Sequence, residues 1–258
     1  MQIIDWLDYT HNRISEPEEG ISLSIGVFDG VHRGHQELIR RITASPHVPA
    51  VLTFAQNPRQ ILKKGSRHGE ITSLSQKLAV MESFGVFRAL VIDFSTGFST
   101  LSGREFIRLL TVRHKIGLMV VGSNFHCGFR QDTDAALFKS ICEKAGVKTE
   151  VLPPLMEGRR PVSSSRIRSL VAEGDLRGAA SLLGRPYGID LQGIEAFRTG
   201  DGFYWDAKAA LRLLPPAGVY PVRVLSNGGE WLERILTVHD GRLSIPSVSA
   251  AEYAEFCW

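Results

Sequence analysis

The chain has 258 residues, of which 43% are hydrophobic and 22% charged, and its formal net charge is +3. These values are typical of a globular protein with a large core, so they exclude a mainly disordered chain, and the charge is too small to indicate nucleic-acid binding. The three cysteines, Cys127, Cys142 and Cys257, form no Cys-x-x-Cys pair, which argues against a disulfide framework or a structural zinc site.

Short apolar segments alternate with amphipathic ones through most of the chain. We expect strands at Ile21–Phe28, Val48–Phe54, Phe87–Asp93, Gly117–Val121 and Lys148–Leu152. We expect helices between them at Gly34–Thr43, Ser75–Phe84, Ser102–Val112 and Asp134–Ala145, and Ser102 with Glu105 predicts a capping box. The strands show little polar alternation, as strands buried on both faces do. The sequence therefore predicts an α/β fold with a Rossmann-like parallel sheet covered by helices.

The last third of the chain has a different texture. Two more helices are expected at Ser163–Ala172 and Asp175–Leu183. After Tyr187, short apolar runs such as Gly218–Leu225 and Leu232–Val238 alternate with turn signals and predict a small all-β unit. We place the domains at residues 1–187 and 188–258.

The charges are unevenly distributed along the chain. Lys and Arg outnumber Asp and Glu by 24 to 18 up to residue 188, and acids outnumber bases by 9 to 6 beyond it. The excess of positive charge in the first domain suits an anionic substrate there.

The strongest motif reads Gly26-Val27-Phe28-Asp29-Gly30-Val31-His32-Arg33-Gly34-His35. It lies where the first expected strand ends and the first helix begins, and ligands of open α/β sheets bind at the carboxyl ends of strands. Its glycines permit a tight turn, and a helix N-terminus offers N–H groups and a positive dipole end to phosphate. Two histidines three residues apart can point at one anion. A metal pair or a purely structural turn is the alternative, but no third metal ligand is fixed nearby.

A second motif, Ser163-Ser164-Ser165-Arg166-Ile167-Arg168, opens a predicted helix. Its hydroxyls and N–H groups suit triphosphate oxygens, and the Arg168 guanidinium suits the β- and γ-phosphates. Simple helix capping with an exposed arginine is the alternative. Asn124, at a strand end, can bind a flavin or a phosphate or merely form a turn. Phe54 and Phe125 can pack on a flavin ring or in the core.

These motifs resemble the His-x-Gly-His class of nucleotidyltransferases, and within it the adenylyltransferase domain of prokaryotic FAD synthetases. The resemblance spans residues 21–188 and includes further segments in the same order. They are Val51–Phe54 with Asn57-Pro58-Arg59, Leu101-Ser102 with Glu105-Phe106, Val121–Phe125 with Gly128 and Asp134, Val162–Arg168, and Gly174-Asp175 with Leu182–Tyr187. The family usually has a carboxylate where Ala55 stands and a histidine where Asn57 stands, and a different turn at Phe129–Thr133, so this chain departs from it on the flavin side.

The resemblance implies transfer of AMP from ATP to FMN, giving FAD and pyrophosphate. It implies that His32, His35 and Arg168 are catalytic. It assigns ATP binding to Gly26, Phe28, Asp29, Gly30, Gly34, Ser163, Ser164 and Ser165. It assigns flavin binding to Phe54, Asn57, Pro58, Arg59, Asn124 and Phe125. Mg²⁺ is expected through the ATP phosphates, with no dedicated metal ligands on the protein.

In bifunctional family members a riboflavin kinase barrel follows the Leu182–Tyr187 segment. Here the corresponding stretch, residues 193–205, contains no Pro-Thr-Ala-Asn run, and only Pro216–Val222 resembles the barrel. We therefore expect a degenerate, β-barrel-like C-terminal domain without kinase activity. Two other interpretations remain: an enzyme of the same class with another phosphorylated acceptor, and a flavin-binding regulator with impaired catalysis.

The sequence contains no secretory signal and no apolar run long enough for a membrane span. We therefore expect a cytoplasmic protein that binds small molecules, ATP and FMN, rather than nucleic acid or membrane. The sequence does not predict an oligomeric state.

Overall fold

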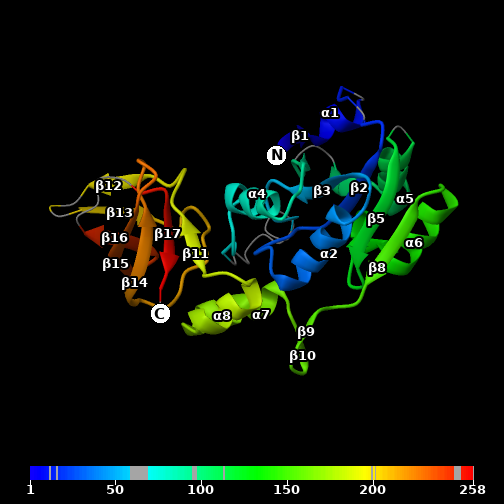
Figure 1. The fold of residues 1–258 in the computed structure, drawn as a ribbon. Coiled ribbons are helices and arrows are strands. Elements are labelled where there is room, and N and C mark those ends of the chain that lie inside the picture. The colour runs from blue at the N-terminus through cyan, green and yellow to red at the C-terminus, as the bar shows by residue number, and fades with distance from the viewer. Residues whose placement is uncertain are drawn as a thin grey trace. The chain divides into compact units, whose positions relative to one another are not determined.

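The computed structural model describes residues 1–11, 13–15, 17–58, 69–94, 98–112, 114–198, 200, 202–246 and 251–257. The chain forms two compact units (Figure 1). The first comprises residues 1–64 and 77–161, and the second residues 65–76 and 162–258. The helices expected at residues 163–183 thus group with the C-terminal strands. The functional boundary at residues 187/188 stays a prediction.

The first unit is built on a six-stranded sheet in which every strand pair is parallel. Its strands are β1 (Gln2–Asp5), β2 (Ile21–Ile25), β3 (Val48–Phe54), β4 (Arg88–Ile92), β5 (Ile116–Gly122) and β8 (Lys148–Leu152). They lie in the order β1-β4-β3-β2-β5-β8. The predicted Rossmann-like sheet is confirmed, with β1 as an edge strand that the sequence analysis did not anticipate.

Helices cover both faces of this sheet. They are α1 (Trp6–Thr10), α2 (Arg33–Thr43), α4 (Leu74–Ser83), α5 (Gly103–Thr111) and α6 (Ala135–Lys144). Side chains of α1, α5 and α6 share one core cluster with Leu23 and Ile25 of β2. The alternate residues of β2 face the other side, where the Ser22 hydroxyl donates to the Ile42 carbonyl of α2.

Helix α5 begins as its sequence predicts. Ser102 accepts a hydrogen bond from the Glu105 N–H (3.3 Å), and the Glu105 carboxylate accepts one from the Ser102 N–H (2.8 Å). This reciprocal pair is the expected capping box. The short ladders β6 (His126–Cys127) with β7 (Thr133–Asp134), and β9 (Met156–Glu157) with β10 (Arg160–Pro161), complete the unit.

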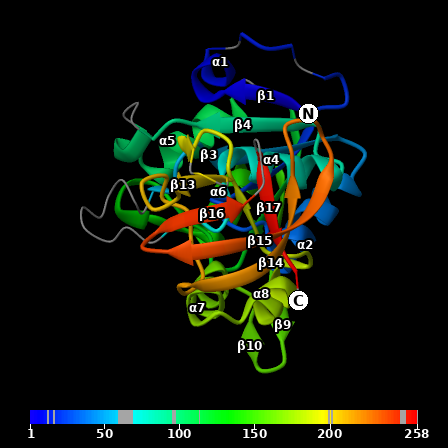
Figure 2. The same cartoon turned by 90° about the vertical axis from the view of Figure 1, so that its left-hand side faces the viewer.

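In the second unit, the described residues form helices α7 (Ser164–Glu173) and α8 (Leu176–Leu183) and an antiparallel sheet (Figure 2). The strands are β11 (Gly188–Asp190), β12 (Ala196–Arg198), β13 (Gly202–Asp206), β14 (Gly218–Leu225), β15 (Trp231–His239), β16 (Arg242–Pro246) and β17 (Tyr253–Phe256). They lie in the order β11-β17-β14-β15-β16-β13-β12. The predicted all-β unit is thus a seven-stranded sheet.

Candidate active site

The loop between β2 and α2, residues 26–32, occupies the switch point of the parallel sheet. Strand β2 pairs with β3 on one side and β5 on the other. The chain runs from β2 outward through β3 and β4, then returns to β5 and continues outward to β8. The loops that leave β2 and β5 therefore diverge at one edge of the sheet, where open α/β sheets bind ligands.

A tight turn shapes this loop. The N–H of Val31 donates to the Phe28 carbonyl (3.0 Å), and Gly30 at the third turn position has φ 85°. A positive φ there is easy only for glycine, which explains Gly30. Phe28 (φ 53°) and Val31 (φ 38°) also have positive φ, although both side chains are fully buried. The backbone turn explains why the strand ends at Ile25 rather than at Phe28 as expected.

The two histidines of the motif lie together at the start of α2. His32 is the N-cap, and its Nδ1 accepts a hydrogen bond from the His35 N–H (3.3 Å). A neutral His32 therefore carries its proton on Nε2, where it is a donor. The two rings stack with centroids 3.6 Å apart and an angle of 15° between their planes. Gly34 lies in the first turn of α2 between them, and Asp29 is buried in the preceding loop.

The His35 ring is held in an apolar and cationic environment. It contacts the edge of Phe28, with centroids 5.2 Å apart, and burial lowers its pKa well below 6.5, as do the nearby His32 and Lys77. Its Nδ1 is buried and has no hydrogen-bond partner among the described residues. Because such an atom costs free energy when unpaired, it points to a ligand that completes its hydrogen bond.

Lys77 of α4 is a charged residue that our sequence analysis did not single out. It is buried, and its Nζ donates to the carbonyls of Val27 (3.2 Å) and Phe54 (3.0 Å), at the ends of β2 and β3. The signal was present in the sequence, because Leu74, Lys77, Leu78 and Met81 have the spacing of one buried helix face. A lysine on an apolar helix face must find hydrogen-bond acceptors inside the protein, so its position indicates polar groups beneath that face.

The residues after β5 lie at the same sheet edge. Asn124 is exposed in a turn closed by a hydrogen bond from the Phe125 N–H to the Gly122 carbonyl (2.9 Å). Phe125 packs edge-on against Phe138 of α6, with centroids 5.0 Å apart, so it is partly engaged in the core. The exposed side-chain amide of Asn124 is therefore more accessible to a ligand than the ring of Phe125.

The segment after β3 contains the other expected flavin residues. Phe54 ends β3, half-buried, and contacts the rings of Phe94 (6.0 Å) and Phe98 (5.8 Å). Asn57 and Pro58 follow and are half-buried. Arg59 lies outside the described residues. The Phe54 ring therefore packs against the core of the first unit. Its carbonyl and that of Val27, in the loop after β2, both accept hydrogen bonds from Lys77.

The Ser/Arg motif begins α7 in the second unit. Ser163 is the N-cap, and its hydroxyl accepts a hydrogen bond from the Arg166 N–H (3.3 Å). Ser164 is half-buried and Ser165 exposed, in the first turn. Arg168 is half-buried, and its Nε donates to the Gly69 carbonyl (3.4 Å). The predicted cap is confirmed, and ligand binding by these residues stays a prediction.

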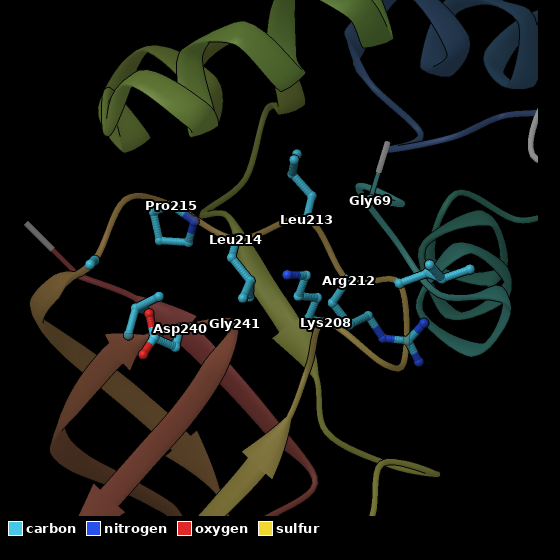
Figure 3. A pocket seen from close by; sticks show the side chains of 11 residues that line it. Gly69, Lys208, Arg212, Leu213, Leu214, Pro215, Asp240 and Gly241 are labelled. Atoms are coloured by element: carbon cyan, nitrogen blue, oxygen red, sulfur yellow. The ribbon is translucent and has the colours of Figure 1, made fainter. Parts of the chain in front are cut away.

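The second unit also contains a cavity of about 350 Å³ beside Lys208 and Arg212 (Figure 3). Leucine, proline and valine side chains form much of its wall. Arg212 is ion-paired with Glu70 (3.9 Å), and its Nε donates to the Asp190 carbonyl (3.3 Å). Because a carboxylate already faces this guanidinium, the cavity is a weaker phosphate site than the start of α2.

In the described part of the chain, no three His, Cys, Asp or Glu side chains gather closely enough to bind a metal ion. The described helices also include none with the length and apolar character needed to cross a bilayer.

Comparison with known proteins identifies the family. The model of the FAD synthetase family matches residues 14–166. The bifunctional riboflavin kinase/FMN adenylyltransferase of Escherichia coli K12 is 32% identical over 238 residues, which cover 88% of this chain and 75% of that protein. The Bacillus subtilis protein of the same name is 31% identical, covering 86% of this chain and 73% of that protein.

A solved structure from Streptococcus pneumoniae, described as a macrolide-efflux protein, shares the fold with a TM-score of 0.79. It is 22% identical to this chain, and the match covers 100% of this chain and 90% of that one. At this identity the likeness supports the architecture of both units and nothing further. With the histidine pair at the switch point, the family model and the two relatives, the chain belongs to the FAD synthetase family.

Proposed function

We propose that this protein transfers AMP from ATP to FMN, producing FAD and pyrophosphate. The observation that carries the proposal is the stacked His32–His35 pair at the start of α2, with the buried Nδ1 of His35 lacking a partner among the described residues. Membership of the FAD synthetase family supplies the acceptor and the donor.

In the proposed reaction, a phosphate oxygen of FMN attacks the α-phosphorus of ATP. The new bond joins the two phosphates of FAD, and the bond from the α-phosphorus to the bridging oxygen breaks, so that pyrophosphate leaves with the electron pair. The Nε2–H of His32 and a ring N–H of His35 donate hydrogen bonds to the α-phosphate oxygens as their charge develops. Because these donors are held in place before the substrate arrives, little reorganisation accompanies the reaction.

The loop and helix start provide the rest of the phosphate cradle. Gly26, Gly30 and Gly34 let the backbone approach the nucleotide, and Phe28 and Asp29 fix the turn. The dipole of α2 favours the anion at its N-terminus. We assign the β- and γ-phosphates to Ser163, Ser164, Ser165 and Arg168. Mg²⁺ bound to the ATP phosphates would neutralise part of their charge, and we expect it to keep several of its waters.

We assign the flavin to the residues that follow β3 and β5. Asn124 would supply polar contacts, with Asn57, Pro58 and Arg59 beside Phe54 and Phe125. The departures from the family at Ala55–Asn57 and Phe129–Thr133 fall in these same segments. The second of these contains Arg130 and Gln131 at positive φ, 55° and 62°.

We also propose that the C-terminal domain, residues 188–258, does not phosphorylate riboflavin. Residues 193–205 correspond to the phosphate-binding loop of the kinase barrel. They include β12 and most of β13, and their sequence contains no Pro-Thr-Ala-Asn run. Trp205 of β13 is buried, and Phe197 stacks on Tyr204 with centroids 4.9 Å apart. Side chains committed to packing within a sheet do not orient a nucleotide or its metal ion.

The test is chromatography of the products formed with ATP and Mg²⁺ from FMN, riboflavin, or another phosphorylated acceptor. FMN should yield FAD and pyrophosphate, and riboflavin should yield neither FMN nor FAD. FMN binding without pyrophosphate release would replace the enzyme with a flavin-binding regulator. Turnover with another acceptor but not with FMN would reassign the substrate.

A further inference from the structure

Lys77 joins two strands of the sheet at the edge where the candidate site lies. Its Nζ reaches the carbonyl of Val27, two residues beyond the end of β2, and that of Phe54, the last residue of β3. Only 6% of Lys77 is exposed. Burying an ammonium group is costly unless it is hydrogen-bonded, so these two hydrogen bonds are what make the buried position of Lys77 at this edge of the sheet possible.

The loop that Lys77 contacts leads directly to the histidine pair. Val27 precedes the turn of Phe28–Val31, and the N-cap His32 follows that turn directly. Displacing the Val27 carbonyl would therefore shift the turn and, through it, the stacked rings. A displacement of about 1 Å at a positioned catalytic group can cost roughly 100-fold in rate.

The charge of Lys77 also acts on His35. Its positive charge disfavours a second positive charge on the imidazole and lowers the pKa of His35, alongside burial and His32. Helix α2 packs on β2, β3 and β5, whose sequences contain no titratable side chain. Asp29 is the buried acid of the same loop. Lys77 is thus a cation from another element that contributes, after burial and His32, to the lowered pKa of this ring.

We propose that Lys77 is a positioning residue of the transferase site, tying the ends of β2 and β3 together so that the His32–His35 pair is held in place for the α-phosphate. It acts through the loop and through His35. The role of these histidines in transfer rests on the function proposed above, whereas the coupling of Lys77 to His35 does not.

The experiment compares Lys77→Met, which keeps the length and loses the charge, with Lys77→Arg, which keeps the charge. The matched control is Lys139→Met on α6, where the lysine side chain is 45% exposed. Histidine ring resonances are titrated by NMR without nucleotide, with His35 assigned from the spectrum of His35→Ala. FAD formation is measured in parallel at varied ATP and FMN concentrations.

In Lys77→Met we expect the protonation midpoint of His35 to rise toward 6.5, because one cause of its lowering is gone. We expect kcat to fall by roughly 10- to 100-fold, with KM for FMN within about 3-fold of wild type. Lys77→Arg should keep the wild-type midpoint, and Lys139→Met should match wild type in both measurements. If Lys77→Met does not unfold cooperatively, Lys77→Gln replaces it.

An unchanged His35 midpoint in the folded, uncharged variant would overturn the coupling. A shifted midpoint with unchanged kcat would overturn the positioning role. If the wild-type protein forms no FAD from ATP and FMN, the proposed function fails, and the titration alone decides whether Lys77 acts on His35.

Discussion

Replacing His35 with alanine should separate activity from stability. In the folded protein, its buried Nδ1 without a described partner costs about 1–3 kcal/mol, and the substitution removes that cost. The substitution also removes the ring contacts with His32 and Phe28, worth about 0.5–1.5 kcal/mol each. These effects oppose each other, so the free energy of unfolding should stay within about 1 kcal/mol of wild type.

Turnover should respond very differently. Loss of one preorganised donor to a developing oxyanion typically lowers kcat by about 100- to 1,000-fold. The assay is FAD formation from ATP and FMN, followed by chromatography, beside urea unfolding of the same preparations. His239→Ala is the control, because that side chain is 77% exposed in the second unit.

Two results would refute this reasoning. Near wild-type turnover in His35→Ala would show that the ring does not meet the reacting phosphate. A loss of several kcal/mol in unfolding free energy would show that the ring is a structural part of the loop, so that any loss of activity reflects unfolding.

Further predictions follow from other parts of the structure. Arg168→Ala should raise KM for ATP more than it weakens FMN binding, in separate titrations; the reverse would reverse the assignment of Arg168. Gly103→Ala should destabilise the protein in urea, because a Cβ there would lie 2.1 Å from Thr133 Oγ1; unchanged stability would show that the loop yields freely. Ser102→Ala should cost about 1 kcal/mol through loss of the cap, measured in the same way. The pKa of His35 is lowered in the folded state, so the unfolded chain binds more protons below pH 6.5 and stability should fall as pH falls through that value. Urea unfolding at several pH values should show a weaker dependence in His35→Ala, and an equal dependence would contradict the lowered pKa.

The parallel sheet was predictable because buried parallel strands appear in the sequence as short apolar runs. Val48–Phe54 and Lys148–Leu152 match β3 and β8 residue for residue. Strand β1 escaped because it has only four residues and one buried side chain, Ile4, so it carries little of the apolar signal. Its pairing with β4 depends on residues more than 80 positions away.

The candidate site was predictable to the extent that it lies in one continuous motif. The positions of His32, His35 and Gly30 at a strand–helix junction followed from local patterns. Lys77 did not, because its role depends on carbonyls from two other segments, which the sequence places 23 and 50 residues away. The left-handed Arg130 and Gln131 were equally hidden, since neither residue type favours positive φ.

The positive φ angles of Phe28 and Val31 have a consequence for laboratory evolution of this enzyme. Both residues are fully buried, so the surrounding core holds the loop in a conformation that their own backbones disfavour. A selection for heat resistance alone would favour substitutions that let this segment relax. Variants recovered in that way should have a higher thermal stability and a lower kcat. A selection that also demands FAD formation should leave residues 26–35 unchanged while stabilising the rest of the chain.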